Sequence, residues 1–161
     1  MDCADSLFSP EHHTILSMIY GLWKSRCICL IVEFKIPEIL CTTEKESVCI
    51  DEIARMTGCQ SSAYLYPIMR VLAQYGIGIE LENKHFKKNQ AMELLRRDKG
   101  ANLGHMAAYF TSDEHYTAFR SLGKSVRECQ PCFMLEHGMN HFEYMNDIES
   151  KVYRLVKPRF S

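Results

Sequence analysis

The feature that most constrains this chain of 161 residues is a stretch in which apolar residues recur first at helical spacing and then in alternation. A first face of helical spacing consists of Ile50, Ile53, Ala54 and Met56. Gly58 follows it, and glycine at a helix C-cap readily adopts the left-handed conformation that ends a helix. Ser61 and Ser62 are N-cap candidates for a second helix. The apolar positions of that helix are Leu65, Ile68, Met69, Leu72 and Ala73.

A β-hairpin is predicted directly after the second helix, which Gly76 ends. Strand-like alternation of apolar residues follows at Ile77, Ile79 and Leu81. The turn falls at residues 82–84, and Phe86 starts the return strand. The order helix, turn, helix, hairpin is that of a winged helix, which we predict over about residues 48–90. Modules of this kind either bind DNA or pair subunits.

The N-terminal part of the chain predicts a long apolar helix. Ser9 suits its N-cap and Pro10 its first helical position. The apolar stripe consists of Ile15, Met18, Ile19, Leu22, Trp23, Cys27, Leu30, Ile31 and Phe34. Such a stripe packs either on its own domain or on a partner subunit, and we favour a partner because it exceeds what a small core covers. The residues predicted to form the pairing surface are Ile15, Ile19, Leu22, Trp23, Leu30 and Ile31.

The remaining chain is also largely helical in pattern, so the expected fold class is mainly α, with long helices flanking the winged helix. Asn89 is an N-cap candidate for a helix that runs to Leu95. Later helices are predicted at residues 103–110, 114–126 and 148–156. Pro67 is an irregularity in the second winged-helix helix, where proline removes a backbone donor at a cost of up to about 3 kcal/mol.

Composition restricts the class of protein. The chain is 47% hydrophobic and 24% charged, as expected of a globular protein. Its net charge of −1 gives no general attraction to nucleic acids or acidic membranes. Its opening residues lack the layout of a signal peptide, and no apolar run reaches the roughly 18 residues of a membrane span. Eight cysteines then indicate mostly reduced thiols, and we expect a cytoplasmic protein.

Five short motifs, in order, resemble the N-terminal dimerisation domain of class I S-adenosylmethionine-dependent O-methyltransferases, which include plant phenolic and hydroxyindole methyltransferases. The motifs are Gly21-Leu22-Trp23, Asp51-Glu52-Ile53-Ala54 with Thr57-Gly58, Met69-Arg70-Val71-Leu72 with Gly76, Phe119 with Leu122, and Phe133 with His137-Gly138 and Phe142-Glu143-Tyr144. The resemblance covers the chain from about residue 14 to its end. It departs from the family at residues 128–132, which replace the usual TG-x-P-A turn.

The resemblance implies that residues 1–161 form one dimerisation domain, which exchanges its first helices in an intertwined homodimer and supplies one wall of the methyl-acceptor pocket. The wall candidates by resemblance are Tyr109, Phe110, Phe119, Phe133 and Met134, for each of which a core position is the alternative. S-adenosylmethionine is implied for the full-length family. We expect this chain not to bind it, because the sequence has no GxGxxG motif and the family's cofactor domain would begin beyond Ser161. No catalytic residue is predicted, and the chain alone is expected to be inactive.

Two origins of the chain are compatible with this interpretation. The chain is either a fragment of a longer protein or a natural short form that pairs with itself or with a full-length methyltransferase subunit. The sequence does not choose between them.

A zinc site is an alternative function for the segment near the C-terminus. Its four ligands would be Cys129, Cys132, His137 and His141, because two thiolates and two imidazoles can complete a tetrahedral shell. The gap of four residues between the Cys and His pairs is shorter than in common zinc fingers. We therefore expect no metal there.

A DNA-binding regulator is the alternative reading of the winged helix. The second helix offers only Arg70 and Gln74 as polar side chains that suit base readout. The hairpin adds Lys84, Lys87 and Lys88, but acidic residues flank them. We expect no nucleic-acid partner and no membrane partner, because the charge that drives DNA binding is nearly missing.

Overall fold

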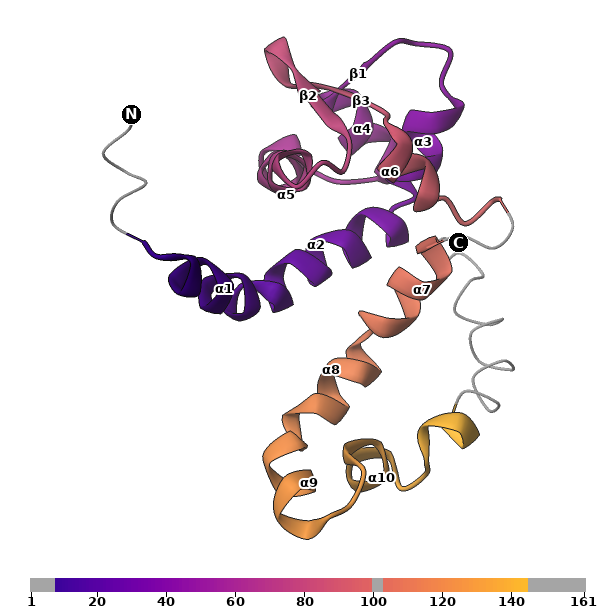
Figure 1. Cartoon of the computed structure of the whole chain (residues 1–161). Coiled ribbons are helices and arrows are strands. Elements are labelled where there is room, and N and C mark those ends of the chain that lie inside the picture. The colour runs from indigo at the N-terminus through magenta and orange to yellow at the C-terminus, as the bar shows by residue number, and fades with distance from the viewer. Residues whose placement is uncertain (1–7, 100–102, 145–161) are drawn as a thin grey trace. The chain divides into compact units, whose positions relative to one another are not determined.

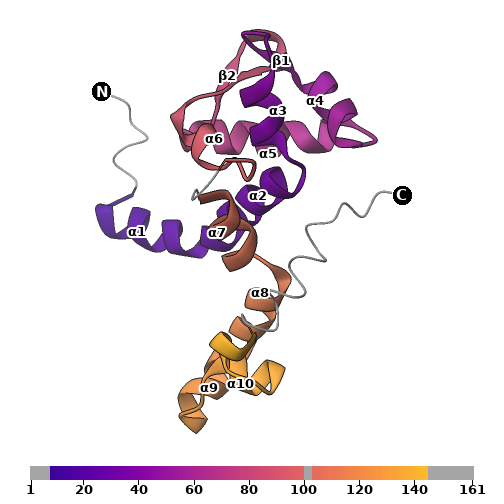
Figure 2. The ribbon, with the colours of Figure 1, turned by 90° about the vertical axis from the view of Figure 1, so that its right-hand side faces the viewer.

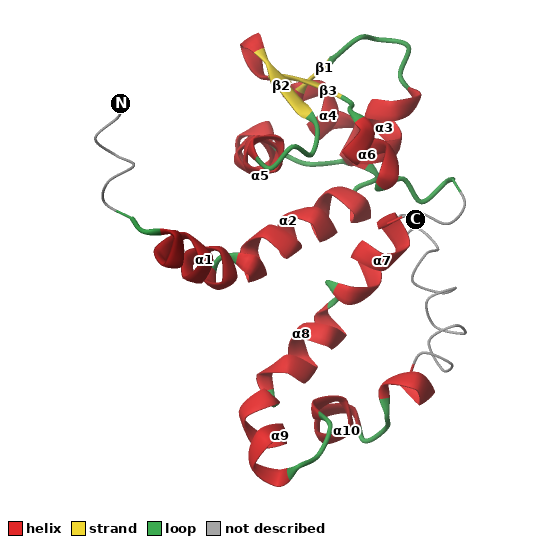
Figure 3. Ribbon diagram, viewed as in Figure 1, coloured by secondary structure: helices red, strands yellow, loops and turns green. Residues whose placement is uncertain are grey.

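The computed structural model describes residues 8–99 and 103–144, and the chain divides into two compact units, residues 1–111 and 112–161. The predicted mainly α fold with a small β-hairpin is confirmed. Most of the described elements are helices, and the strands form one three-stranded antiparallel sheet (Figure 3). The predicted helix at residues 148–156 lies outside the described residues.

The first unit begins with two helices, α1 (Pro10–Ile19) and α2 (Gly21–Glu33), where the sequence predicted one continuous helix. They meet at an angle of 49° at Tyr20. Helical hydrogen bonding continues across the bend, because the Tyr20 amide donates to Leu16 O at 2.9 Å. Gly21 is a poor helix former and stands at the bend, so the long stripe is divided into two straight segments.

Helix α3 (Ile36–Thr42) follows α2 after Lys35, which has a left-handed conformation with φ of 55°. The sequence pattern had indicated only a short segment here. Ile36 and Leu40 are buried on one side of α3. Tertiary packing of that side therefore stabilises a helix too short to be evident from periodicity.

The predicted pair of helices is present as α4 (Ile50–Thr57) and α5 (Ser62–Gln74). Gly58 ends α4 with φ of 74°, and the Ser61 side chain accepts a hydrogen bond from the Ala63 amide at the start of α5, as predicted. Met56 does not belong to the buried face of α4, since it is 51% exposed. Pro67 lies inside α5 on its exposed side.

The sheet consists of β1 (Val48–Cys49), β2 (Ile79–Leu81) and β3 (His85–Lys87), and the short 3-10 helix η1 (Glu82–Lys84) connects β2 to β3. Strand β3 lies between the other two and is antiparallel to both. Phe86 of β3 pairs with Val48 and Glu80 and is fully buried. The predicted hairpin is confirmed, and β1 is a strand that the sequence pattern did not indicate.

One hydrophobic core joins these elements. Its fully buried members include residues of α2, α3, α4, α5, β3 and α6 (Gln90–Leu94), with α6 capped by Asn89 as predicted. The largest are Ile31, Ile36, Ile50, Ile53, Met69, Leu72, Phe86 and Met92. Helix α7 (Leu103–Phe110) packs against α2, and the Arg26 guanidinium donates to Thr111 O at 3.0 Å. In two views, α1 extends beyond the part of this unit formed by the sheet and helices α3–α6 (Figure 1, Figure 2).

The second unit contains α8 (Asp113–Arg120), α9 (Leu122–Glu128) and α10 (Cys132–His137). The single helix predicted at residues 114–126 is divided at Ser121. Helices α8 and α10 pack on each other around Phe133, Ala118 and His115, which are buried.

Candidate functional site

The strongest functional feature of the first unit is an exposed apolar surface on α1 and the start of α2, which we call the N-terminal apolar face. No residue of α1 is buried. The large exposed side chains of the face are Ile15, Met18, Ile19, Tyr20, Leu22 and Trp23. The Tyr20 and Trp23 rings stack at 5.3 Å between centroids. Contiguous apolar surface of this kind marks an interaction site, because water solvates it poorly.

The residues predicted to pair are divided between this face and the core. Trp23 is 66% exposed, and Leu22 is 51% exposed. Ile15 and Ile19 are also exposed, whereas Leu30 is half-buried. Ile31 is fully buried in the core of its own unit. Helix α2 therefore changes along its length from an exposed apolar helix to a core helix.

The wall candidates lie on three helices. Tyr109 and Phe110 end α7, and their rings meet edge to face at 5.1 Å. Phe110 and Phe119 are more than half exposed. Met134 of α10 is also exposed, but Phe133 beside it is buried. Exposure therefore leaves Phe110, Phe119 and Met134 able to contact a ligand, and Phe133 acts as core of the second unit.

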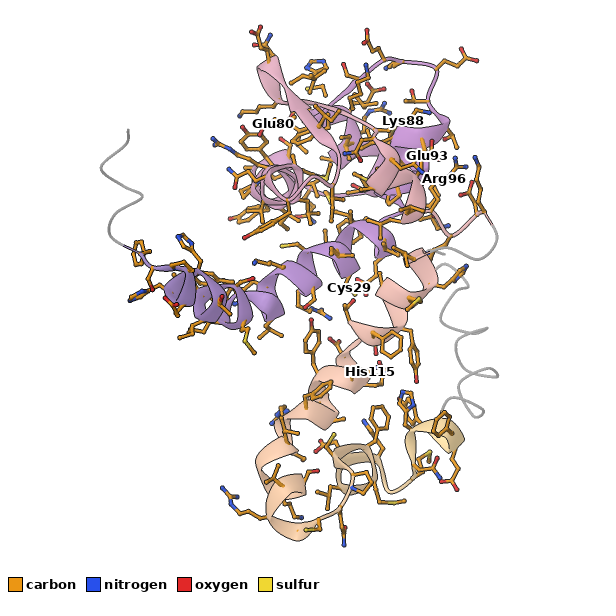
Figure 4. All side chains as sticks on the ribbon, viewed as in Figure 1. Cys29, Glu80, Lys88, Glu93, Arg96 and His115 are labelled. Carbon is orange, nitrogen blue, oxygen red and sulfur yellow. The ribbon has the colours of Figure 1, made fainter. Side chains whose placement is uncertain are left out.

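Three histidines and a tyrosine surround Phe133. Its ring centroid lies 4.8 Å from that of His137 and 5.2 Å from that of the buried His115, which Figure 4 marks on α8. His115 Nε2 and His141 Nε2 are 3.3 Å apart, so one imidazole donates to the other. His137 Nε2 lies 3.1 Å from the backbone oxygen of Glu114 and donates to it. These contacts join α8 to α10 and to the residues that follow α10.

The four residues of the alternative zinc site do not form a metal-ligand group. Cys129 is exposed at the end of α9, while Cys132 starts α10. His137 and His141 are engaged with α8 as described above. In residues 8–99 and 103–144, no three His, Cys, Asp or Glu side chains are placed to hold a metal ion.

A cluster of charged side chains that sequence reasoning missed lies on α6 and the segment after it (Figure 4). Arg96 is only 5% exposed, and its guanidinium lies 3.0 Å from Glu93 and 2.6 Å from Asp98. These hydrogen bonds hold the pKa of both carboxyls below their usual range. The Lys88 ammonium approaches Glu93 at 3.5 Å and also donates to Cys41 O. The cluster connects α6 to α3 and stabilises the fold. In the sequence alone, its charged residues indicate only the end of a helix.

The basic residues on which DNA binding would depend are largely paired with acids. Arg70 Nε lies 3.8 Å from Glu80, which also accepts a hydrogen bond from the Tyr66 hydroxyl (Figure 4). Lys87 Nζ lies 2.7 Å from Glu46. This surface therefore presents little free positive charge to a phosphate backbone.

Within the described residues, no single helix has both the length and the apolar composition of a membrane span. Helices α1 and α2 reach these limits only when they are taken together, and they are bent by 49° at their junction.

Comparison with known proteins finds O-methyltransferases, the group of proteins that the motifs resemble. The mitomycin biosynthesis 6-O-methyltransferase of Streptomyces lavendulae is 24% identical over 140 residues, which are 86% of this chain and 39% of that protein. The structure of the mitomycin 7-O-methyltransferase MmcR matches with a TM-score of 0.74 at 23% identity, over 87% of this chain and 40% of that one. No protein-family model matches the chain.

A structure of human N-acetylserotonin methyltransferase in complex with S-adenosylmethionine also matches, with a TM-score of 0.73 at 14% identity, over 89% of this chain and 42% of that one. The chain thus spans about 40% of the length of the first relatives it matches. The predicted resemblance and the predicted fold are confirmed by these matches.

Proposed function

We propose that this chain, which has the fold of the N-terminal dimerisation domain of class I S-adenosylmethionine-dependent O-methyltransferases, pairs with a second copy of itself and forms one wall of a methyl-acceptor pocket. Residues 1–161 act as one dimerisation domain, with a winged helix at about residues 48–90. In this proposal the methyl donor binds to a part of the whole enzyme other than this chain, which has no glycine-rich nucleotide loop.

The observation that carries the proposal is the N-terminal apolar face. Helix α1 buries none of its residues, and the exposed side chains Ile15, Ile19, Leu22 and Trp23 continue onto α2. Burying one such side chain contributes about 1.5–3 kcal/mol. A symmetric dimer buries the same face twice, so a few large residues account for a stable interface.

The acceptor wall is supported by the exposed aromatic and thioether side chains Phe110, Phe119 and Met134. Their apolar surfaces suit an aromatic methyl acceptor, because ligand sites are lined mainly by hydrophobic and aromatic groups. Tyr109 lies beside Phe110 and supplies a hydroxyl for orientation.

The test of pairing is the solution mass of the Leu22→Glu variant, measured by sedimentation equilibrium. A charge at the centre of a buried interface is strongly unfavourable, so we expect the native chain to be a dimer and the variant to be a monomer. Met56→Glu is the matched control, because Met56 and Leu22 are both 51% exposed and both lie on helices of the first unit.

We expect Met56→Glu to remain a dimer. A native monomer, or a Leu22→Glu variant that dimerises as tightly as the native chain while circular dichroism shows both to be folded, would refute the proposal.

A further inference from the structure

Three of the chain's seven histidines lie close together in the second unit. His115 of α8 is only 5% exposed, and His137 and His141 are half-buried (Figure 4). The centroids of all three rings lie within 5.2 Å of the centroid of the Phe133 ring. Histidine is the side chain whose charge ordinarily changes near neutral pH. A half-buried cluster of three imidazoles is therefore a candidate for a response to acid.

The contact between His115 and His141 needs at least one neutral imidazole. Their Nε2 atoms are 3.3 Å apart, so the N–H group of one ring donates to the lone pair of the other. A single added proton preserves this bond, because an imidazolium donates to a neutral imidazole. When both rings are protonated, two N–H groups face each other without an acceptor, and two positive charges meet beside the apolar Phe133 ring.

The other nitrogen of His115 does not oppose either state of the pair. Its Nδ1 atom lies 3.3 Å from Ser112 Oγ. A serine hydroxyl both donates and accepts, so it can pair with Nδ1 whether or not this nitrogen carries a proton. The sensitivity to acid thus lies in the contact between the two Nε2 atoms.

His137 responds differently to a proton, because its partner is a backbone oxygen. Its Nε2 atom donates to Glu114 O at 3.1 Å. An added proton goes to Nδ1, and the donation from Nε2 is retained. Protonation of His137 therefore leaves its contact with α8 in place.

Other titratable groups lie on the elements that pack around the pair. From α8, α10 and the residues after α10 in turn, they are Asp113, Glu114, Glu136, His137, Glu143 and Tyr144. Glu136 and Glu143 are exposed, and each accepts a hydrogen bond from a group outside the pair. On α9, Lys124 and Glu128 form an ion pair with each other. Carboxyl groups ordinarily change charge at about pH 4 and imidazoles at about pH 6.5, so a response to mild acid would come from the histidines.

We infer that the His115–His141 pair is an acid-sensitive contact, which holds the residues after α10 against α8 near neutral pH and releases them in mild acid. The His141 ring lies 5.1 Å from the Phe133 ring, so Phe133 loses part of its cover when the pair separates. The packing of α10 on α8 weakens as a result. This inference concerns the second unit alone and does not depend on the proposed pairing.

Acid destabilises the second unit in this mechanism. Both imidazoles bind protons freely in the unfolded state below about pH 6.5, whereas the folded contact is compatible with only one added proton. The unfolded state then binds more protons than the folded state, so stability falls as the pH falls. Above this range both rings are neutral, and the contact contributes fully.

Amide hydrogen exchange of the full chain, measured at about pH 7.5 and about pH 5.5, tests the inference. All samples contain a strong chelator, so that no metal ion occupies the imidazoles. The rates are expressed as protection factors, which correct for the pH dependence of intrinsic exchange. We expect α8 and α10 to lose protection roughly tenfold more than α4 and α5 at the lower pH, since a buried hydrogen bond is lost only in the second unit.

His141→Gln should remove this response, because a glutamine amide can pair with His115 but does not titrate. We expect α8 and α10 of this variant to keep their protection at the lower pH. His137→Gln is the matched control. It removes a neighbouring imidazole of the same cluster and leaves the pair intact, so it should show the acid response of the native chain.

Two results would overturn the inference. One is a native chain in which α8 and α10 lose no more protection than α4 and α5. The other is a His141→Gln variant that keeps the full acid response.

If His141→Gln is unprotected at both pH values, the imidazole Cε1–H resonances of the native chain decide. Two separate titration steps for His115 and His141 would support the coupled pair, whereas a single common step for all three histidines would overturn it.

Discussion

Gly104 illustrates how a single residue controls packing in the first unit. It is the second residue of α7 and is buried against the segment after α6. A Cβ atom added to Gly104 would lie 2.2 Å from the backbone oxygen of Leu95. Backbone atoms do not yield as flexible side chains do, so only a hydrogen fits at this position.

The first prediction is that Gly104→Ala destabilises the protein. We expect a loss of about 1–3 kcal/mol, the usual cost of overpacking. Urea unfolding followed by circular dichroism measures it. Gly123→Ala in α9 is the control, because no atom other than the far end of Arg127 lies within 4.0 Å of the added Cβ. Equal stability of the Gly104→Ala variant and the native chain would contradict the prediction.

Arg96 gives a second prediction at the same scale, concerning pH. Its hydrogen bonds lower the pKa of the Glu93 and Asp98 carboxyls in the folded protein. A carboxyl whose folded pKa is lowered adds stability above its unfolded pKa, near 4, and loses that contribution as the pH falls through the folded pKa. Arg96→Met should therefore reduce the difference in urea midpoint between pH 7 and pH 3.

Lys124→Met serves as the control for this experiment. Lys124 and Glu128 form an exposed ion pair at 3.9 Å. Removal of this pair should leave the pH dependence of the urea midpoint unchanged. If Arg96→Met retained the full acid sensitivity of the native chain, the carboxylates of the cluster would not be its source.

At the scale of helices, the packing of α10 depends on one aromatic ring, that of Phe133. Phe133 is the large apolar residue that α10 buries, and the His115, His141 and Tyr144 rings all lie within 5.2 Å of it. Phe119 on α8 is 59% exposed. The same residue type therefore has a core role at one position and is available to a ligand at the other.

The third prediction follows from this contrast. Phe133→Ala should destabilise the second unit by about 3–5 kcal/mol, whereas Phe119→Ala should change its stability by no more than about 0.5 kcal/mol. Amide hydrogen exchange in α8 and α10 reports the two effects separately from the first unit. Equal loss of protection in both variants would show that Phe119 is also a core residue.

At the scale of the whole molecule, the proposed pairing relies on the exposed apolar side chains of α1 and the start of α2. The net charge is −1, and no metal-ligand group exists in the part of the chain that the structure describes. The proposed dimer should consequently resist chelators and added salt alike.

The fourth prediction is that sedimentation equilibrium gives twice the 18.7 kDa mass of one chain, both with and without a strong chelator. The circular dichroism spectrum should also be unchanged, because the described residues contain no group of side chains placed to hold a metal ion. A chelator that dissociates the dimer or unfolds the chain would instead restore the alternative zinc site at Cys129, Cys132, His137 and His141.

Much of the fold could be predicted from local sequence. Gly58, Ser61 and Asn89 each act on their nearest neighbours, through a left-handed turn or a side-chain cap, and all three were assigned correctly. Helix α3 and strand β1 could not be predicted, since both are too short to show periodicity and depend on partners far along the chain. The charged cluster around Arg96 was missed for a different reason: Glu93 and Asp98 lie near Arg96 in the chain, but the burial of Arg96 is set by tertiary packing.

Sequence by itself determined the order of the helices, the hairpin and the resemblance to O-methyltransferases, because caps, turns and apolar spacing act over a few residues. Tertiary structure alone decided which apolar residues are available for binding. Leu22 and Ile31 share one apolar stripe, yet Leu22 is exposed and Ile31 is fully buried. The reason is that helical periodicity shows only that a helix has an apolar face. How much of that face is buried depends on the other elements that pack against it.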